Sequence, residues 1–377
     1  MKVLQLVKTS IGAKWALLQM RELVKLGVEV HVAMPIDGML VPKYKEFGVQ
    51  IHPMTFSLKN IFKSCNDLKK IVKEVNPDLI HSHFVLTTLI MRIALRKDNR
   101  PRIFQVPGPL HLENFIFRHL DIMSAQKNDC WVGSCNWTNN CYESHGISKD
   151  RIFLSYYGSD MMHQKGPGNR MLHKELNIKE DSIIIGMVAY MYAPKFYLGQ
   201  TRGLKGHEDF IDAISIVTKK YPNVYGVCVG GAWNNAFKYE TKVRQYAKEK
   251  TDHIFFLGTR KDVANLYSDM YCVVHPSHSE NLGGAAESLA VGVPTIATNI
   301  GGFPDIVKNN QTGLLIPAKS PSDLADAIIW YIQNKKKMLD FARNGEEFVK
   351  ELLDVKNTSH TIWDIYNKVL ALNKIKA

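Results

Sequence analysis

Two glutamates flank a glycine pair in the stretch HPSHSENLGGAAESLAVGVPTIATNIGGFPDIV, residues 275–307. Glu280 precedes the pair Gly283-Gly284, and Glu287 follows it. The small and apolar residues of 283–290 predict the start of a helix, where the first backbone amides have no partner within the helix and attract anions. Glycines also let a phosphate approach the backbone closely. The pattern therefore predicts an anion site between two carboxylates.

Each part of this stretch suits a different part of a phosphorylated ligand. The amides of Leu282, Gly283 and Gly284 point outward and suit a phosphate. Glu287 follows one turn later, where its carboxylate can accept two hydrogen bonds from a vicinal diol such as ribose. Glu280 lies on the preceding loop, nearer to whatever group the phosphate carries.

A second stretch, GQTRGLKGHEDFIDAI, supplies cations for an anion. Arg202 and Lys205 precede an expected helix, and Glu208 and Asp209 suit the first turn of that helix. Two cations facing a set of free amides suit a diphosphate. The alternative is that Lys205 lies in a simple turn and that Arg202 is a solvated loop charge.

Size and composition limit the class of protein. A chain of 377 residues with 45% hydrophobic residues predicts about two globular domains. No apolar run approaches the roughly 18 residues needed to span a bilayer, and the opening MKVLQLVKTS is too quickly polar for a signal peptide. The six cysteines form no CxxC pair, so we expect free thiols and a cytoplasmic protein.

The net charge of +12 favours an anionic partner, which could be nucleic acid, an anionic membrane surface or a small substrate. One expected helix carries Lys59, Lys63, Lys70 and Lys73 largely off its apolar stripe. That basic side is either simply solvated or in contact with the inner face of an anionic membrane. Aromatic and basic residues do not cluster as in nucleic-acid-binding proteins, so we expect no nucleic acid.

Short β-branched runs alternate with amphipathic stretches in two separate series, which is typical of parallel sheets covered by helices. The first series predicts a helix at 14–27 and a polar linker at 158–181. Its expected strands are 2–7, 28–35, 78–84, 102–108, 130–134 and 151–157.

The second series predicts helices at 206–221, 235–250 and 323–337. Its expected strands are 182–192, 224–231, 253–258, 271–277, 294–299 and 312–317. The simplest arrangement is an α/β chain of two doubly wound domains that face each other across a cleft. Ligands would bind at the carboxyl ends of the strands.

The same segments resemble the retaining glycosyltransferases of family 4, which have the GT-B fold of two Rossmann-like domains, and the resemblance covers nearly the whole chain. It rests on HPSHSENLGGAAESLAVGVPTIATNIGGFPDIV, on KGHEDFIDAI, which is similar to the diphosphate-binding lysine region, and on KTSIGAKWALL, which is similar to the first glycine loop. The resemblance implies an acceptor-binding domain at 1–170, a donor-binding domain at 171–356, and a helix at 357–377 that returns to the first domain.

The resemblance also implies a role for individual residues. Glu287 would bind the ribose of the donor, and Lys205 would bind its diphosphate together with Arg202 or Lys195. Gly12 would approach the donor from the first domain, and His111 in VPGPLHLE would match the family's active-site histidine. Three residues are thus expected to be catalytic: His111, Lys205 and Glu280. The donor sugar would be held by Glu280 and the amides after it, which belong to Asn281, Leu282, Gly283 and Gly284.

Two departures from the family pattern stand out. Six residues separate Glu280 from Glu287 where the family has seven, so that Ser279 occupies the usual place of the first glutamate. The usual double glycine of the first loop is reduced to Ile11-Gly12. We interpret the first departure as a shifted loop that still delivers Glu280.

The resemblance implies transfer of a sugar, with UDP as the expected carrier, to a saccharide or lipid-linked acceptor in cell-surface polysaccharide or glycoconjugate synthesis. We expect no cofactor and no metal, because no DxD-type carboxylate pair is placed to hold a cation. Several alternatives remain open: a glycosyltransferase for small molecules, a nucleotide-sugar epimerase of the same fold, a basic nucleic-acid-binding protein, and a silent sugar-nucleotide sensor.

Overall fold

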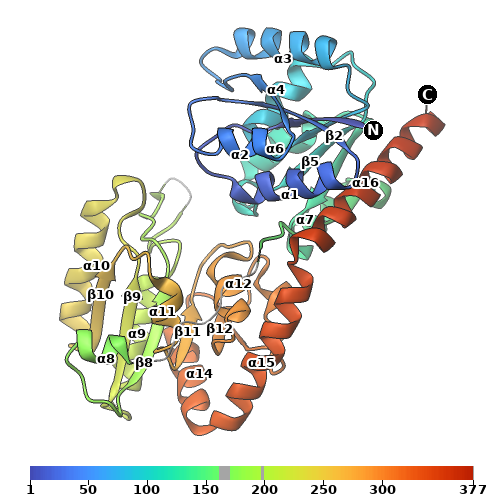
Figure 1. Ribbon diagram of the computed structural model, residues 1–377. Coiled ribbons are helices and arrows are strands. Elements are labelled where there is room, and N and C mark those ends of the chain that lie inside the picture. Colours follow the sequence, from blue (N-terminus) through green and yellow to red (C-terminus); the bar gives the residue numbers. More distant parts are fainter. Residues whose placement is uncertain (161–169, 197–198, 377) are drawn as a thin grey trace. The chain divides into compact units, whose positions relative to one another are not determined.

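The computed structural model describes residues 1–160, 170–196 and 199–376, with side chains as far as residue 373. The chain forms two compact units (Figure 1). One contains Met1–Asp160 and Leu352–Ala377, and the other contains Met161–Glu351. The first boundary lies at residue 160, ten residues before the expected 170. The second lies at residue 351, five residues before the expected 356. The linker expected at 158–181 lies partly outside the described residues, and its later part contains helix α8 (Met171–Glu175).

The first unit is built on a parallel sheet of seven strands in the order β3-β2-β1-β4-β5-β6-β7. The strand β3 was not expected, because QIHP lacks a clear alternation of apolar and polar residues. The strands are β1 (Lys2–Leu6), β2 (Glu29–Met34), β3 (Gln50–Pro53), β4 (Leu79–Ser82), β5 (Arg102–Val106), β6 (Asp129–Gly133) and β7 (Ile152–Leu154).

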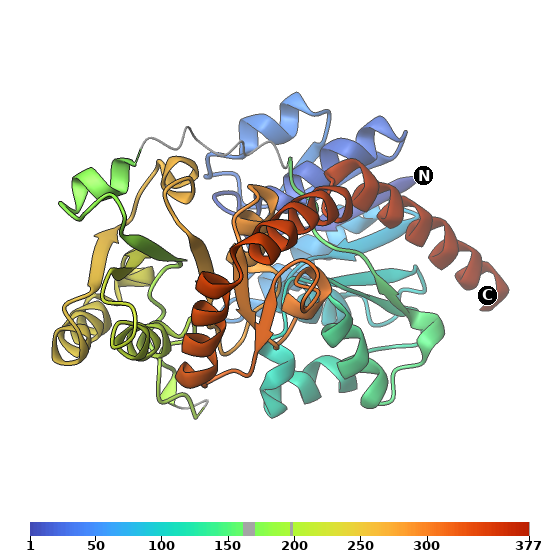
Figure 2. The ribbon, with the colours of Figure 1, turned by 90° about the horizontal axis from the view of Figure 1, so that it is seen from below.

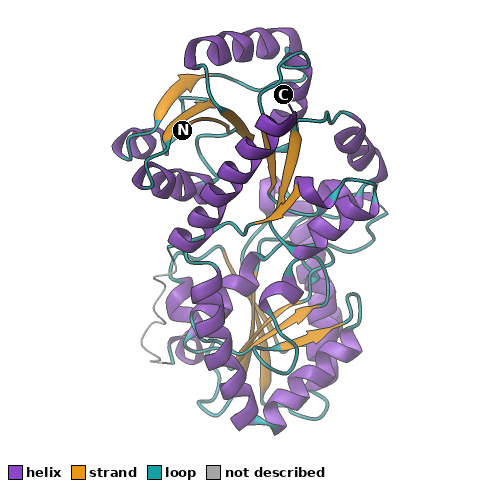
Figure 3. Ribbon diagram, turned by 90° about the vertical axis from the view of Figure 1, so that its right-hand side faces the viewer, coloured by secondary structure: helices purple, strands orange, loops and turns teal. Residues whose placement is uncertain are grey.

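The side chains of β1 show why helices must cover both faces of this sheet. Val3 belongs to one apolar cluster, whereas Leu4 and Leu6 belong to the cluster on the other face. Figure 3 shows helices on both sides of the strands. They are α1 (Lys14–Lys25), α2 (Val41–Glu46), α3 (Ile61–Val75), α4 (Val85–Ala94), α5 (Leu110–Glu113), α6 (Phe115–Met123) and α7 (Asn136–Ser144).

The last helix, α16 (Val355–Lys376), packs on the first unit, beside α1 (Figures 1 and 2). Its buried residues Ile362, Ile365, Tyr366 and Val369 follow helical spacing and join the apolar cluster under β1 and β2. The Tyr366 hydroxyl also lies 2.6 Å from His81 Nδ1, inside the core. Apolar burial and a buried hydrogen bond therefore both hold the chain's end on this unit.

The second unit is built on a parallel sheet of six strands in the order β10-β9-β8-β11-β12-β13. The strands are β8 (Ile183–Val188), β9 (Val224–Val229), β10 (Ile254–Gly258), β11 (Cys272–His275), β12 (Thr295–Thr298) and β13 (Leu314–Ile316). The helices that follow α8 are α9 (His207–Val217), α10 (Phe237–Lys250), α11 (Val263–Tyr267), α12 (Gly283–Ala290), α13 (Phe303–Ile306), α14 (Pro321–Gln333) and α15 (Lys335–Leu352).

The strand order places a switch point between β8 and β11. From β8 the chain proceeds outward to β9 and β10, and it then returns to build β11 to β13 on the other side of β8. Two strands that lead to helices on opposite faces leave a crevice at their carboxyl ends, which is where open α/β sheets bind ligands. The sheet therefore points to the ends of β8 and β11 as the place for a site.

Two further expectations from the sequence concern the cysteines and the membrane-spanning potential of the helices. The six cysteines are all free thiols, as expected from their spacing. Across the described residues, no helix combines the length and apolar character that crossing a bilayer requires.

Candidate active site

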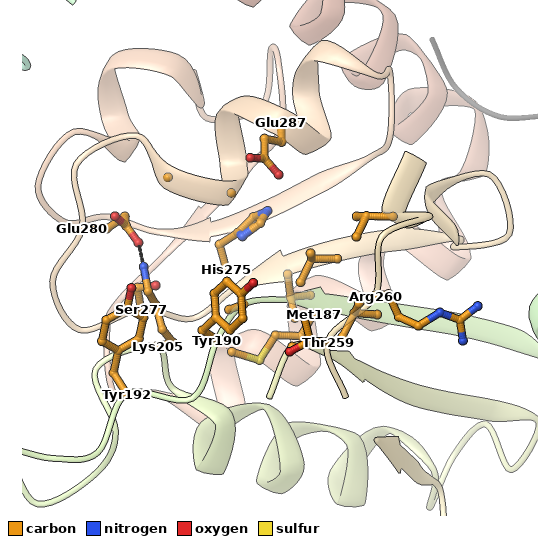
Figure 4. Close-up of a pocket in the computed structure, with 18 residues that line it drawn as sticks. Met187, Tyr190, Tyr192, Lys205, Thr259, Arg260, His275, Ser277, Glu280 and Glu287 are labelled. Carbon is orange, nitrogen blue, oxygen red and sulfur yellow. Dashed lines mark hydrogen bonds and ion pairs between the residues drawn. The ribbon is translucent and has the colours of Figure 1, made fainter. Parts of the chain in front are cut away.

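A cavity of about 420 Å³ lies at the switch point of the second unit. Its walls come from the carboxyl ends of β8, β9 and β11, from the turn after β10, and from the start of α12. Five of the residues singled out in the sequence line it: Lys205, Glu280, Gly283, Gly284 and Glu287 (Figure 4). Segments up to 100 residues apart in the chain, from Met187 to Glu287, thus meet at one edge of the sheet.

The glycine pair opens α12, which spans the same residues, 283–290, that its composition predicted. The residue before it, Leu282, is buried and supplies no side-chain hydrogen bond to the helix. Leu282 therefore does not cap the first backbone amides of α12. The amides of Gly283 and Gly284 belong to residues of the cavity wall. Neither Asn281 nor Leu282 is among the described lining residues.

Glu287 stands one turn into α12 and is exposed on the side of the cavity (Figure 4). The other residues of this turn, Ala285, Ala286 and Ser288, are buried. The helix therefore turns its carboxylate toward the cavity and its small side chains toward the core. This geometry suits a carboxylate that accepts hydrogen bonds from hydroxyl groups of a ligand.

Lys205 and Glu280 form an ion pair between Nζ and Oε2 across the cavity wall (Figure 4). Their side chains are only 17% and 14% exposed. The two loops meet because Gly206, with φ +75°, presses on the loop after β11: a Cβ there would lie 2.0 Å from the carbonyl oxygen of Pro276. Only glycine fits this close approach in a left-handed conformation.

Aromatic rings border the pair. The ammonium of Lys205 lies 5.5 Å from the centre of the Tyr192 ring, within range of a cation–π contact. Burial, and secondly the charge of Glu280, raise the pKa of Tyr192, so its hydroxyl stays protonated and can donate a hydrogen bond. Tyr190 and Trp233 pack beside it, with ring centres 5.2 Å apart.

His275 forms part of the cavity floor and is buried. Burial, and secondly the charge of Lys205, lower its pKa to about 3, so the imidazole is neutral near pH 7. Its Nε2 lies 3.0 Å from the Ser288 hydroxyl. His275 therefore supports the start of α12 and adds no positive charge to the cavity.

Several lining residues at strand ends were not expected from the sequence, among them Tyr190, Tyr192, Thr259 and Arg260. The Arg260 guanidinium is held by Asp262 and by Glu175, at 2.7 and 2.6 Å. The signal that could have found these residues is their place directly after β8 and β10, because loops at the carboxyl ends of parallel strands converge.

The structure does not bring Arg202 and Lys195 together with Lys205. Neither is among the described residues that line the cavity. Lys195 is exposed, and Arg202 pairs with two carboxylates of α9, Asp209 and Asp212. A role of Arg202 or Lys195 at a diphosphate therefore stays a prediction, and in the structure the charge of Arg202 is engaged by Asp209 and Asp212.

Arg202 instead belongs to a network that fixes the loops of the site. The buried Asp209 carboxylate contacts Arg202 on one side and His278 Nε2 on the other, at 2.5 Å. The amide of His278 donates to the carbonyl of Leu204 at 2.8 Å. The loop that carries Glu280 is thus tied to the loop that carries Lys205.

Gly12 and His111 belong to the first unit. Gly12 is exposed in the loop before α1, and a Cβ there would meet no atom within 4 Å, whereas Ala13 holds the left-handed conformation of this loop, with φ 62°. The loop therefore does not need a glycine at position 12 for its own geometry.

His111 lies in a polar cluster rather than on an open surface. Its Nε2 is 3.4 Å from Asp121 Oδ2 and 3.3 Å from the Tyr142 hydroxyl. Burial acts to raise the pKa of Asp121, but the hydrogen bond from His111 and the charge of Arg92 outweigh it and lower that pKa. The cluster orients the imidazole, and its side chain is 10% exposed.

Among the described residues, no group of three or more His, Cys, Asp or Glu side chains is placed to hold a metal ion.

Two family models match the chain, one in each unit. The model described as Glycosyl transferases group 1 matches residues 194–348, and the model described as Glycosyltransferase Family 4 matches residues 13–161. The first match contains Lys205, Glu280 and Glu287, and it ends within α15. Together the two models account for most of both sheets.

Relatives and solved structures agree with these models. The chain is 24% identical over 400 residues to the capsular polysaccharide biosynthesis glycosyltransferase CapM of Staphylococcus aureus, covering 98% of this chain and 97% of that one. It is 24% identical over 341 residues to an Escherichia coli enzyme named UDP-Gal:alpha-D-GlcNAc-diphosphoundecaprenol alpha-1,3-galactosyltransferase, covering 86% and 85%.

The fold matches that of HepE from Anabaena with a TM-score of 0.80 at 19% identity, over 97% of this chain and 100% of that one. This similarity establishes the GT-B architecture, in which both domains are doubly wound around parallel sheets.

The network around Arg202 generates a first prediction. Arg202→Met leaves the buried Asp209 carboxylate with one partner fewer, so we expect it to lower stability by about 1–3 kcal/mol, seen as a lower midpoint of thermal unfolding. Nucleotide affinity, measured by calorimetry below that midpoint, should stay within about threefold of the native value. A stable variant that has lost nucleotide binding would instead return Arg202 to the diphosphate.

Proposed function

Because the chain belongs to the group 1 glycosyl transferases of glycosyltransferase family 4, we propose that it moves a hexose from a nucleoside diphosphate sugar to a saccharide or lipid-linked saccharide, with retention of configuration. One observation carries the proposal. Glu287, the two glycines that open α12, the cation Lys205 and the carboxylate of Glu280 all line a single cavity, and these groups suit a ribose, a diphosphate and a sugar.

In this proposal each part of the donor meets a separate group of the cavity. Glu287 accepts hydrogen bonds from the ribose hydroxyls, and the amides of Gly283 and Gly284 hold the diphosphate together with Lys205. Glu280 lies beside Lys205 and accepts hydrogen bonds from the sugar hydroxyls. The cavity of about 420 Å³ has the size of ordinary small-molecule sites.

Transfer breaks the bond between the sugar's anomeric carbon and the phosphate oxygen, and it forms a bond from that carbon to the acceptor oxygen. Negative charge grows on the departing phosphate, where Lys205 and the amides at the start of α12 can stabilise it, so these groups favour the transition state over the ground state. For retention, the acceptor hydroxyl attacks from the face that the phosphate leaves. The phosphate oxygen takes the hydroxyl's proton.

The proposed carrier nucleotide is UDP. The Anabaena protein of the same fold is described in complex with UDP, and the Escherichia coli relative is named for UDP-Gal. The names of the bacterial relatives also favour cell-surface polysaccharides or lipid-linked saccharides as acceptors.

A panel of UDP-, GDP- and ADP-sugars tests the proposal directly. We expect one family of sugar nucleotides to raise the midpoint of thermal unfolding, because a ligand that binds the folded state stabilises it. The same compound should release its nucleotide only slowly until a saccharide or lipid-linked acceptor is added. Conversion of the nucleotide sugar to its epimer without acceptor would favour an epimerase instead.

The role of Glu287 gives the second prediction. Glu287→Ala should weaken donor binding by about 3 kcal/mol, or roughly 100-fold, through loss of two hydrogen bonds to a charged acceptor. Calorimetry with the sugar nucleotide found above measures the change. Glu249→Ala, which alters an exposed glutamate of α10, is the matched control and should bind as the native protein does. An unchanged affinity in Glu287→Ala would remove this residue from the ribose.

The third prediction concerns metal. If Lys205 and the helix amides stabilise the leaving diphosphate, activity should persist in excess chelator, and Lys205→Ala should reduce kcat by roughly 100-fold or more. Initial rates with and without EDTA, at one donor and acceptor concentration, measure this. Loss of activity in EDTA that magnesium or manganese restores would require a cation in the reaction.

We also propose that the basic side of α3 contacts an anionic membrane, which would suit a lipid-linked acceptor. Lys63, Lys70 and Lys73 of α3 are exposed, as is Lys59, which precedes the helix, whereas Leu68 and Val72 of α3 are buried. Two large apolar side chains beside these lysines are also exposed: Leu58 at 61% and Phe62 at 85%. Lysines with neighbouring exposed apolar side chains are the combination that binds lipid surfaces.

The fourth prediction follows from this surface. The protein should sediment with liposomes of phosphatidylglycerol and phosphatidylcholine at low salt, and changing Lys59, Lys63, Lys70 and Lys73 to glutamine should weaken binding at least 10-fold, since each basic residue contributes about 1 kcal/mol. A control that changes the same number of exposed lysines elsewhere to glutamine should lose less: Lys248, Lys335, Lys336 and Lys356. Equal losses of liposome binding in both variants would mean that net charge causes the binding and that the position of these lysines does not matter.

A further inference from the structure

We propose that the ion pair between Lys205 and Glu280 makes the site hold a nucleoside diphosphate without its sugar more weakly than the sugar nucleotide, and so promotes product release. The inference rests on the proposed function, and it assigns to Glu280 an effect on the product as well as on the donor sugar. Its basis is the pairing and the charge balance of the cavity.

The charged residues that line the cavity cancel. The described lining contains two cations, Lys205 and Arg260, and two carboxylates, Glu280 and Glu287, so its formal charge is zero. His275 adds nothing, because burial lowers its pKa to about 3. A diphosphate must therefore enter a cavity with no surplus of positive charge.

Both cations already have carboxylate partners. Arg260 is engaged by Asp262 and Glu175, and Lys205 by Glu280. Since the side chains of Lys205 and Glu280 are 17% and 14% exposed, water and salt screen this pair less than a surface pair. A diphosphate that takes Lys205 must compete with the Glu280 carboxylate for it.

Of the two partners, Glu280 is the more closely held, because its carboxylate also accepts a hydrogen bond from the amide of Asn281 at 3.2 Å. Its carbonyl accepts from the amide of Gly302 at 3.3 Å, and a Cβ at Gly301 would lie 1.9 Å from that same carbonyl oxygen. Its carboxyl carbon lies 2.6 Å from the place where a Cβ of Gly283 would be. Backbone on two sides thus confines Glu280.

Lys205 is the partner that can move. Its four-carbon side chain is flexible, and the ring of Tyr192 at 5.5 Å offers its ammonium a surface when it leaves Glu280. On arrival of the donor we therefore expect Lys205 to shift toward the diphosphate while Glu280 stays in place.

The free-energy cost of moving Lys205 away from Glu280 depends on whether a sugar is attached to the diphosphate. With a sugar nucleotide, sugar hydroxyls donate to Glu280 and replace the lost ammonium. With the nucleoside diphosphate alone, Glu280 either keeps Lys205 or remains as a partly buried carboxylate beside a phosphate, and an uncompensated charge of this kind is costly. Transfer of the sugar therefore turns Glu280 from a ligand of the donor into a repulsive neighbour of the product.

Glu280→Gln tests the inference, because it removes the charge and keeps the shape. Calorimetry with UDP should show affinity about 10-fold tighter than that of the native protein, a usual size for coupling between neighbouring groups. Inorganic diphosphate should show the same gain, since it carries neither ribose nor sugar. Glu287→Gln, which neutralises the other carboxylate of the cavity, is the matched control and should bind UDP no more tightly than the native protein.

A second variant isolates the pair. In a Lys205→Ala background, Glu280→Gln should lose most of its gain, because the released ammonium is what the diphosphate uses. If Glu280→Gln does not fold, the native protein gives an equivalent measurement: free hexose at saturating concentration should tighten UDP binding, since its hydroxyls occupy Glu280.

The outcomes separate this inference from the function. A folded Glu280→Gln variant whose UDP affinity is unchanged or weaker overturns the inference, and the absence of hexose synergy does so if that variant cannot be made. The proposed function stands in both cases as long as the native protein binds a sugar nucleotide and transfers its sugar. Failure of the native protein to bind any nucleotide overturns both.

Discussion

The candidate site depends on one close backbone approach, that of Gly206 to the loop after β11. The Cβ of any other residue at this position would lie 2.0 Å from the carbonyl oxygen of Pro276. This contact places the start of α9 against the end of β11, and it thereby brings Lys205 beside Glu280. A glycine without a side chain thus determines where the charged side chains of the site meet.

The buried charges near this contact serve the structure more than the ligand. Asp209, Arg202 and His278 connect the two loops by ion pairs and hydrogen bonds, and none of the three is among the described residues that line the cavity. A charge network of this kind adds little net stability compared with apolar packing, but it allows one arrangement of the loops. Cationic side chains such as that of Arg202 would attract a diphosphate. Here Arg202 instead helps to position the loops that carry Lys205 and Glu280.

The sequence was most informative where local chemistry decides the structure. The range of α12 and the twelve expected strands were predicted from glycine placement and apolar runs, because these signals are local. The pairing of Arg202, the short β3, and the contributions of Tyr190 and Arg260 were missed. Each of these depends on which strand ends converge or on which carboxylates lie nearby, and spacing along the chain does not contain that information.

The charge of the chain and the charge of the site are separate properties. The protein has a net charge of +12, yet the charged residues that line the described cavity sum to zero. An anionic donor would therefore be held by directed amides and one shared lysine, since the cavity itself supplies no excess of cations. The surplus lies on exposed surfaces such as α3, where Lys63, Lys70 and Lys73 face solvent. Binding of the donor does not account for those lysines, so their purpose must be sought in what the first unit contacts.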